Sequence, residues 1–215
     1  MSQIPAFTQF IAINPPNQAR SQEALDRILA AGEALLADNA FEEAGISLIA
    51  ARANSSVGTF YRLLENKDNL SLLLLQRFFS QVTVAVDELC AVERWADKDL
   101  NLFAHTFIQS FVNIYAGRRG VLRALILRAS RSREFRDRVH QLNDYTADKI
   151  VQVLSRHRDQ IHHPDPTMAM PTAVHIVLGA LNQHTVAGTL GALSPTQLIG
   201  ELTRVFTAYL TIGEP

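Results

Sequence analysis

The chain has 215 residues, of which 47% are hydrophobic and 19% are charged. This apolar fraction is ample for a packed core and predicts a globular, soluble protein of one or two domains. With 20 basic and 21 acidic side chains, the formal net charge of −1 gives no indication by itself of a polyanionic partner.

The single cysteine, Cys90, has no partner for an intramolecular disulfide, and its apolar neighbours predict a buried thiol in a reducing, cytoplasmic compartment. The longest apolar run near the middle of the chain, residues 70–75, is far shorter than the roughly 20 residues of a membrane span. The N-terminus lacks an early basic cluster, so neither a secretory signal nor a membrane partner is expected.

Residues 1–20 contain three prolines and no sustained hydrophobic period, which predicts a flexible N-terminal arm. Arg20 is either part of a solvated terminus or able to reach a DNA phosphate or the minor groove, as arms do in several DNA-binding folds. Ser21 is predicted to cap a helix over residues 21–39, with Glu23 in its favourable first turn.

Two short helical patterns then meet across a polar turn. Ser47 is a good N-cap for a first helix of about two turns, in which Ile49 and Ala50 lie at helical spacing. Asn54 and Ser55 interrupt this pattern, and Asn tolerates the left-handed backbone that such a turn requires.

Ser56 is predicted to cap the second helix, whose Phe60, Leu63 and Leu64 face inward. Two short helices packed at a steep angle form a helix-turn-helix, in which the second helix enters the major groove with its N-terminal residues at the base edges. The side chains expected to contact DNA are those on the outward face and at the two helix starts: Ser47, Ser56, Val57, Gly58, Thr59, Tyr61, Arg62 and Lys67.

The stretch from Phe41 to Leu70 resembles the DNA-binding half of the TetR family of bacterial transcriptional regulators. The resemblance is carried by Ala44-Gly45, Ile49-Ala50, Gly58-Thr59-Phe60-Tyr61 and Asn66-Lys67-Asp68. It implies that Tyr61 and Lys67 hold phosphates, and that Thr59 and Ser47 assist at the backbone or at a base. The chain departs from the family pattern at Asn54 and Ser55, where a Gly and a β-branched apolar residue are usual, and at Leu64, where Phe is usual.

Beyond Lys67, which opens a long helix, the chain keeps a helical period and has no alternating strand pattern, so the predicted class is all-α. The expected domains are an arm at 1–20, a helix-turn-helix domain of three helices at 21–66, and a helical bundle for ligand binding and dimerisation at 67–215. Further helices are predicted at about 67–92, 100–115, 121–129, 132–161, 171–190 and 194–212, with Gly117 and Gly120 bracketing a tight turn.

Charge is distributed unevenly along the chain. Residues 1–70 carry a net charge of −3, which is unfavourable for a DNA-binding module and implies reliance on a few placed cations. Residues 118–158 carry a net charge of +7, which is either a solvated helix face or a region that attracts an acidic ligand or flanking DNA.

No arrangement of catalytic side chains stands out, so we expect neither an enzyme nor a cofactor. His157, His162 and His163 lie near two aspartates, but their spacing matches no standard zinc arrangement, and no metal site is expected.

The last two predicted helices carry more apolar surface than one core requires, which fits a four-helix interface between two copies, the mode of dimerisation implied by the resemblance. Ser194 to Gln197 forms a capping box with Pro195 at the first helical position. The homodimer interface is predicted to contain Val174, Leu178, Leu181, Leu202, Val205, Phe206 and Tyr209.

Bulky apolar side chains on adjoining helices predict a pocket for a small molecule. Its expected lining is Phe103, Phe107, Phe111 and Leu125, with Arg128 at the edge to meet the acidic end of an apolar effector. The chain is therefore interpreted as a TetR-type regulator, a repressor that a small ligand releases from its operator. The alternative is a helical ligand-binding or scaffold protein whose degenerate helix-turn-helix no longer binds DNA.

Overall fold

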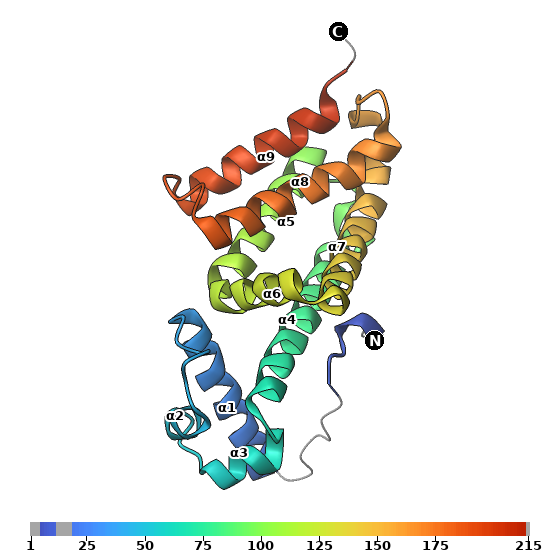
Figure 1. Ribbon diagram of the computed structural model, residues 1–215. Helices are drawn as coiled ribbons and strands as arrows, with labels where there is room; N and C mark the ends of the chain where they lie inside the picture. The colour runs from blue at the N-terminus through green and yellow to red at the C-terminus, as the bar shows by residue number, and fades with distance from the viewer. Residues whose placement is uncertain (1–4, 12–18, 214–215) are drawn as a thin grey trace. The chain divides into compact units, whose positions relative to one another are not determined.

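The computed structural model describes residues 5–11 and 19–213, and over these ranges it contains nine α-helices, three short 3-10 helices and no strand (Figure 1). The all-α prediction is confirmed. Of the expected arm, residues 1–4 and 12–18 lie outside the described residues.

The chain divides into two compact units. Among the described residues, the head unit comprises residues 5–11, 19–81 and 118–135, and the body unit comprises residues 82–117 and 136–213. This division differs from the expected boundary after residue 66, because residues 118–135 pack with the N-terminal helices.

The head unit is built on α1 (Ala19–Ala37), α2 (Ile46–Arg52), α3 (Val57–Leu64), the first part of α4 (Lys67–Leu89) and α6 (Arg119–Arg131). Its core includes the fully buried Ile28, Leu35, Ile49 and Phe60. Ser21 is not the N-cap of α1, because the helix already includes Ala19. Ser21 is instead a buried residue of the first helical turn.

Gly120 allows α6 to approach the end of α1 very closely. A Cβ atom on Gly120 would lie 2.3 Å from the carbonyl carbon of Leu36 and 2.5 Å from the backbone nitrogen of Ala37. In place of the expected turn between Gly117 and Gly120, only Arg118 separates the end of α5 from the start of α6. The Arg118 guanidinium donates to the Glu33 carboxylate of α1 at 2.7 Å. Gly120 is therefore a helical residue whose lack of a side chain serves packing.

The described part of the arm is anchored to the head unit. The backbone N–H groups of Phe10 and Ile11 donate to the Gln76 side-chain carbonyl at 2.9 and 3.1 Å. The Phe10 ring stacks on Phe135 and meets Phe79 edge-on, with centroid distances of 4.9 and 4.8 Å. Residues 5–11, which include the 3-10 helix η1 (Ala6–Thr8), therefore belong to the packed structure and correct the expectation of a flexible segment there.

α4 ends at Leu89, slightly earlier than expected, and has the length and composition of a membrane span, with a mean hydropathy of 1.2 over 18 residues. Such a helix is weak evidence for a membrane, and 44% of the window is buried inside the structure. In the head unit the apolar residues of α4 include Leu70, Leu74 and Leu75, all buried. Packing against protein therefore accounts for much of its hydropathy.

The body unit contains η2 (Val92–Trp95), α5 (Leu100–Gly117), most of α7 (Arg133–Leu154), η3 (Ser155–Gln160), α8 (Pro166–Ala187) and α9 (Pro195–Thr211). α5, α8 and α9 pack on one another (Figure 1). The capping box at Ser194 is confirmed. α8 begins five residues before the expected start, because Asp165 caps it and Pro171 lies inside the helix.

Candidate DNA interface and effector regions

The turn between α2 and α3 has the geometry of a helix-turn-helix despite its polar sequence. Asn54 adopts a left-handed backbone with φ of 47°, and the Ser55 N–H donates to the Ala50 carbonyl at 2.9 Å. Ser56 is the N-cap of α3, since its hydroxyl accepts a hydrogen bond from the Thr59 N–H at 3.1 Å. The predicted roles of Asn54 and Ser56 in the turn are therefore confirmed.

The N-cap of α2 is Gly45 rather than Ser47. The Gly45 carbonyl accepts from the N–H groups of Leu48 and Ile49 at 3.0 and 3.2 Å, which are the first hydrogen bonds of the helix. Ser47 consequently lies in the first turn with an exposed side chain. Its expected contact with DNA stays a prediction.

The first turn of α3 presents an accessible face. Val57 is 38% exposed, and Gly58 is exposed with space where a Cβ would lie, since the nearest neighbouring atom is the Ser56 hydroxyl oxygen at 3.9 Å. Thr59 is half-buried, and its hydroxyl is 2.9 Å from that of Ser56. Because the space beside Gly58 is open, a DNA groove can approach the backbone there.

Tyr61 and Lys67 differ in how firmly the chain holds them. Tyr61 is 51% exposed, and its ring is nearly perpendicular to that of Phe60, with centroids 6.1 Å apart. The Lys67 ammonium donates to the Glu42 carbonyl at 2.7 Å and lies 5.0 Å from the centroid of the Phe41 ring. An ammonium has three N–H donors, so Lys67 keeps donors for a phosphate while one of them fixes its position.

Arg62 of α3 and Arg27 of α1 make two hydrogen bonds that link α1 to the helix-turn-helix. An Arg62 guanidinium nitrogen donates to the Ser21 hydroxyl at 3.4 Å, and the Arg27 Nε donates to the Ala53 carbonyl at 3.1 Å. Arg27 could not be identified from the sequence, because no local pattern relates a residue of α1 to a carbonyl at the end of α2.

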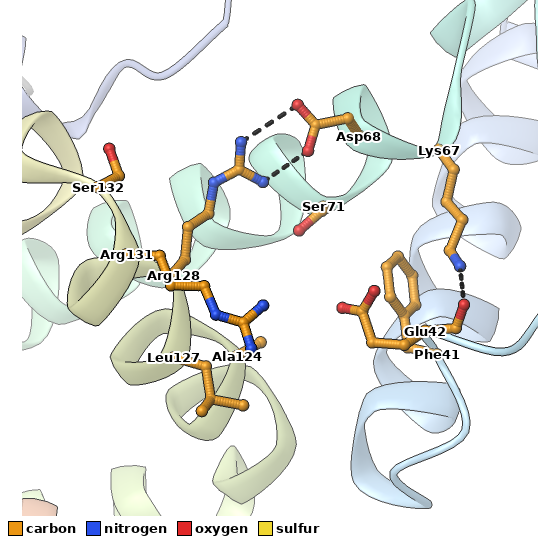
Figure 2. A pocket seen from close by; sticks show the side chains of 10 residues that line it. All are labelled: Phe41, Glu42, Lys67, Asp68, Ser71, Ala124, Leu127, Arg128, Arg131 and Ser132. Carbon is orange, nitrogen blue, oxygen red and sulfur yellow. Dashed lines mark hydrogen bonds and ion pairs between the residues drawn. The ribbon is translucent and has the colours of Figure 1, made fainter.

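Arg128 is paired with an acidic side chain in the head unit. It lines a pocket of about 500 Å³ formed by the start of α4, the end of α6 and the segment before α2 (Figure 2). Its guanidinium binds both carboxylate oxygens of Asp68, at 2.6 and 3.1 Å, and lies 4.6 Å from the centroid of the Phe135 ring. Hydrogen bonding to Arg128 lowers the pKa of Asp68 from its ordinary value of 3.8.

The aromatic residues of α5 form part of the body core. Phe103, Phe107 and Phe111 are buried, and Phe107 packs on Phe206 of α9 with ring centroids 5.6 Å apart. Leu125 is buried in the head unit. Contact of these side chains with an effector stays a prediction.

The structure corrects most of the predicted dimer interface. Val174, Leu178, Leu181, Leu202 and Phe206 are all buried in the core of the single chain and have almost no surface to offer a second copy. Val205 is 50% exposed and Tyr209 is half-buried, so only these two of the predicted residues remain available. Other exposed apolar side chains on α8 include Met168, Ile176 and Val186.

Within residues 5–11 and 19–213, the structure brings together no group of three His, Cys, Asp or Glu side chains that could hold a metal ion. Of the histidines that follow α7, His163 accepts a hydrogen bond from the Asp165 N–H at 3.1 Å.

Comparisons with known proteins cover both units. Residues 28–73 match the family described as bacterial regulatory proteins, tetR family, and residues 99–210 match the Tetracyclin repressor-like, C-terminal domain. No curated protein matches the chain in a sequence search.

Solved structures share the fold at low sequence identity. A TetR-family transcriptional regulator from Mesorhizobium loti is 16% identical with a TM-score of 0.66, over 90% of this chain and 98% of that one. NalD from Pseudomonas aeruginosa, the secondary repressor of the MexAB-OprM multidrug efflux pump, is 17% identical with a TM-score of 0.64, over 90% and 98%. The fatty acid degradation regulator FadR from Bacillus halodurans is 15% identical with a TM-score of 0.62, over 85% and 94%.

The match to residues 99–210 covers more than half of the chain, and the match to residues 28–73 contains the helix-turn-helix. Membership in this family implies binding to operator DNA and dimerisation through the C-terminal domain, in a family without enzymatic activity. The chain belongs to the TetR family of bacterial DNA-binding transcriptional regulators.

Proposed function

We propose that this TetR-family regulator is a cytoplasmic repressor whose dimer binds a two-part operator and is released by a small, largely apolar effector that is neutral or acidic. The observation that carries the DNA part is the accessible first turn of α3, where Val57 is exposed and the space beside Gly58 is open. An α-helix placed in the major groove reads base edges with such N-terminal residues.

The alternative of a degenerate helix-turn-helix rests on the polar turn. Asn54 takes the left-handed conformation that a Gly would supply there, and Ser56 caps α3 through its side chain. Both features support a turn that holds α3 in a productive geometry. The proposed roles are base contact for Val57, Gly58 and Thr59, with Ser47, Ser56, Tyr61, Arg62 and Lys67 on the backbone.

The test of DNA binding is a titration of a fluorescent duplex from the region flanking the protein's own gene, repeated over a range of salt concentrations. Lys67→Ala should weaken binding to all duplexes alike and reduce the salt slope by about one unit for each phosphate that the lysine neutralises. Tyr61→Phe removes only a hydroxyl and should also weaken all duplexes alike. Substitution of Thr59 should instead change the order of preference among operator variants.

A lack of binding to any flanking or randomly selected duplex would favour the scaffold alternative. A changed operator preference in Lys67→Ala would contradict the role of Lys67 at a phosphate. A uniform loss of affinity in the Thr59 variant would contradict its role in reading sequence.

The effector proposal has two separate parts. The aromatic side chains of α5 (Phe103, Phe107 and Phe111) supply apolar surface in the body unit. Arg128 supplies a guanidinium in the head unit, and an acidic ligand there has to compete with the Asp68 carboxylate. Fatty acids and neutral aromatic compounds are suitable probes, because two proteins of this fold are a fatty acid degradation regulator and a repressor of a multidrug efflux pump.

Calorimetric titration should find apolar acids or neutral aromatics ahead of cations. Arg128→Ala should selectively weaken the acids and leave the neutral compounds unchanged, so the neutral compounds are the internal control. A preference for cations, or unchanged affinity for acids in the variant, would contradict the charge part and leave the apolar part standing.

A further inference from the structure

A second pocket, of about 450 Å³, lies beside the helix-turn-helix and is formed entirely by residues of the head unit. It is bounded by the start of α1, the turn between α2 and α3, and one side of α3. Its lining is strongly polar and consists of Arg20, Ser21, Ala24, Arg27, Asn54, Ser55, Ser56, Thr59 and Arg62.

Positive charge is concentrated in this pocket. Three guanidinium groups line it and no carboxylate does, although residues 1–70 as a whole carry a net charge of −3. Over the described stretch of the chain, Arg20, Arg27 and Arg62 form no ion pair with an acidic side chain. Three neighbouring guanidiniums without a counter-charge repel one another, so an anion in the pocket would be stabilised.

The three arginines are held to different degrees. Arg27 is fixed through its Nε to the Ala53 carbonyl at 3.1 Å, and Arg62 contacts the Ser21 hydroxyl at 3.4 Å. Arg20 is exposed, and its side chain makes no hydrogen bond or ion pair within residues 5–11 and 19–213. Arg27 therefore orders the wall of the pocket, and Arg20 and Arg62 have N–H donors left for a ligand.

The polar turn belongs to the same pocket. Asn54 and Ser55, the two turn positions at which the chain departs from the usual family pattern, both line it. An amide and a hydroxyl supply hydrogen-bond donors that a Gly and a β-branched apolar residue lack. The departure is then a gain of ligand donors at the turn and not a loss of the motif.

We infer that this arginine pocket binds one phosphate of the operator backbone, with Arg20 and Arg62 as the charged contacts, Asn54 and Ser55 as additional donors, and Arg27 as the positioning residue. The inference rests on the proposed DNA binding and deepens it. Because Ser56 and Thr59 border the pocket, a phosphate bound there fixes the position of the first turn of α3 against the bases.

The first test compares Arg20→Ala with the wild type in the salt-dependent duplex titration. The variant should bind every duplex about tenfold more weakly, without a change in sequence preference. The salt slope should fall by about 0.9 for each phosphate that is no longer neutralised, which is about 1.8 for a dimer on two half-sites. Arg20→Lys, which keeps the charge, should recover most of the slope.

Arg77→Ala is the matched control, because it removes the same charge from the head unit outside the pocket. Arg77 lies on α4 and pairs with Asp26 at 3.9 Å. The salt slope of DNA affinity in Arg77→Ala should equal that of the wild type. Asn54→Gly keeps the left-handed turn, since Gly adopts positive φ readily, and should weaken all duplexes alike without lowering the temperature of unfolding.

A second test locates the phosphate. Duplexes carrying a neutral methylphosphonate at one backbone position at a time are titrated with wild type and Arg20→Ala. One position in each half-site should weaken the wild type and leave the variant unaffected. Equal losses of affinity for both proteins at every position would overturn the pocket as a phosphate site.

The outcomes separate the pocket from the proposed function. A wild type that binds no duplex overturns the DNA-binding function. A wild type that binds, with Arg20→Ala unchanged in affinity and slope, overturns the pocket alone. NMR titration tests for a different ligand. If inorganic phosphate binds saturably at the pocket and Arg20→Ala leaves DNA affinity unchanged, the site belongs to a free anion, and the operator backbone is rejected as its ligand.

Discussion

Arg128 of α6 binds Asp68 of α4 through two guanidinium nitrogens, at 2.6 and 3.1 Å, although the two residues are 60 positions apart in the sequence. Asp68 lies in the first turn of α4 and Arg128 in the last turn of α6, so each charge also interacts favourably with the dipole of its own helix. This ion pair fixes the end of α6 on the start of α4 within the head unit, directly beside Lys67 (Figure 2).

Removal of this ion pair should give a pH-dependent loss of stability. The Asp68 pKa is lowered in the folded chain. The ion pair's contribution to the free energy of unfolding is therefore fully present at pH values above the ordinary pKa of 3.8, and it is lost as the pH falls through the folded pKa. Since the Asp68 side chain is 62% exposed, solvent screening limits the effect of Asp68→Asn to about 0.5 kcal/mol at pH 7. Urea unfolding should show this difference at pH 7 and a smaller one at pH 3; an equal difference at both values would contradict the assignment.

Gly58→Ala should change stability and DNA binding in opposite directions. The added Cβ meets nothing closer than the Ser56 hydroxyl at 3.9 Å, and Ala is favoured over Gly within a helix by about 0.5–1 kcal/mol. The same methyl group would occupy the space that a base edge needs, so operator affinity should fall by about tenfold or more. Thermal unfolding and duplex titration measure the two effects.

Gly200→Ala on α9 is the matched control for this experiment, because an added Cβ there also meets nothing within 4 Å. It should share the gain in stability and leave operator affinity unchanged. An unaltered operator affinity in Gly58→Ala would remove the first turn of α3 from the base-reading surface.

Gly120→Ala should destabilise the head unit strongly. Its Cβ would lie 2.3 Å from the Leu36 carbonyl carbon, and a backbone atom cannot rotate away as a side-chain end can. The expected loss is about 1–3 kcal/mol of the free energy of unfolding, the usual range for overpacking. Urea unfolding should show the loss, whereas a stability equal to that of the wild type would mean that α6 does not approach α1 this closely.

Val205→Glu should produce a folded monomer. Val205 is 50% exposed on α9, and a charge there would be desolvated only in a dimer. Leu202→Glu is expected to behave differently, because Leu202 is buried in the core of the single chain and its replacement should prevent folding. Sedimentation measures the oligomeric state, and circular dichroism measures folding.

The wild type should sediment as a dimer at micromolar concentration. A dimer that persists in Val205→Glu would place the interface elsewhere on the chain. A folded Leu202→Glu monomer would return this position to the interface that the sequence suggested.

Cys90 should react slowly with thiol reagents in the folded chain. Burial raises the pKa of its thiol to about 12, so hardly any reactive thiolate is present at neutral pH. The rate of labelling with Ellman's reagent should increase steeply across the unfolding transition in urea. Rapid labelling without denaturant would show that the thiol is accessible in the native protein.

Features that depend on short separations along the chain could be predicted from its sequence. The Ser56 cap and the Ser194 capping box join atoms three residues apart, and Asn54 supplies the left-handed turn through its own backbone. Hydrophobic spacing likewise predicted the all-α class and most helices, because a helix face is set by residues three and four positions apart.

Features that depend on distant partners were decided by the tertiary structure. Nothing local relates Arg128 to Asp68, Gly120 to Leu36, or Arg27 to Ala53. The two apolar stripes of α8 and α9 were visible in the sequence, but the hydrophobic effect is non-directional, so only the packed chain shows that Val174 and Leu202 face its own core and that Val205 does not. The arginine pocket also appears only after folding, because Arg20 and Arg27 come from α1 and Arg62 comes from α3, two helices that are not consecutive in the chain.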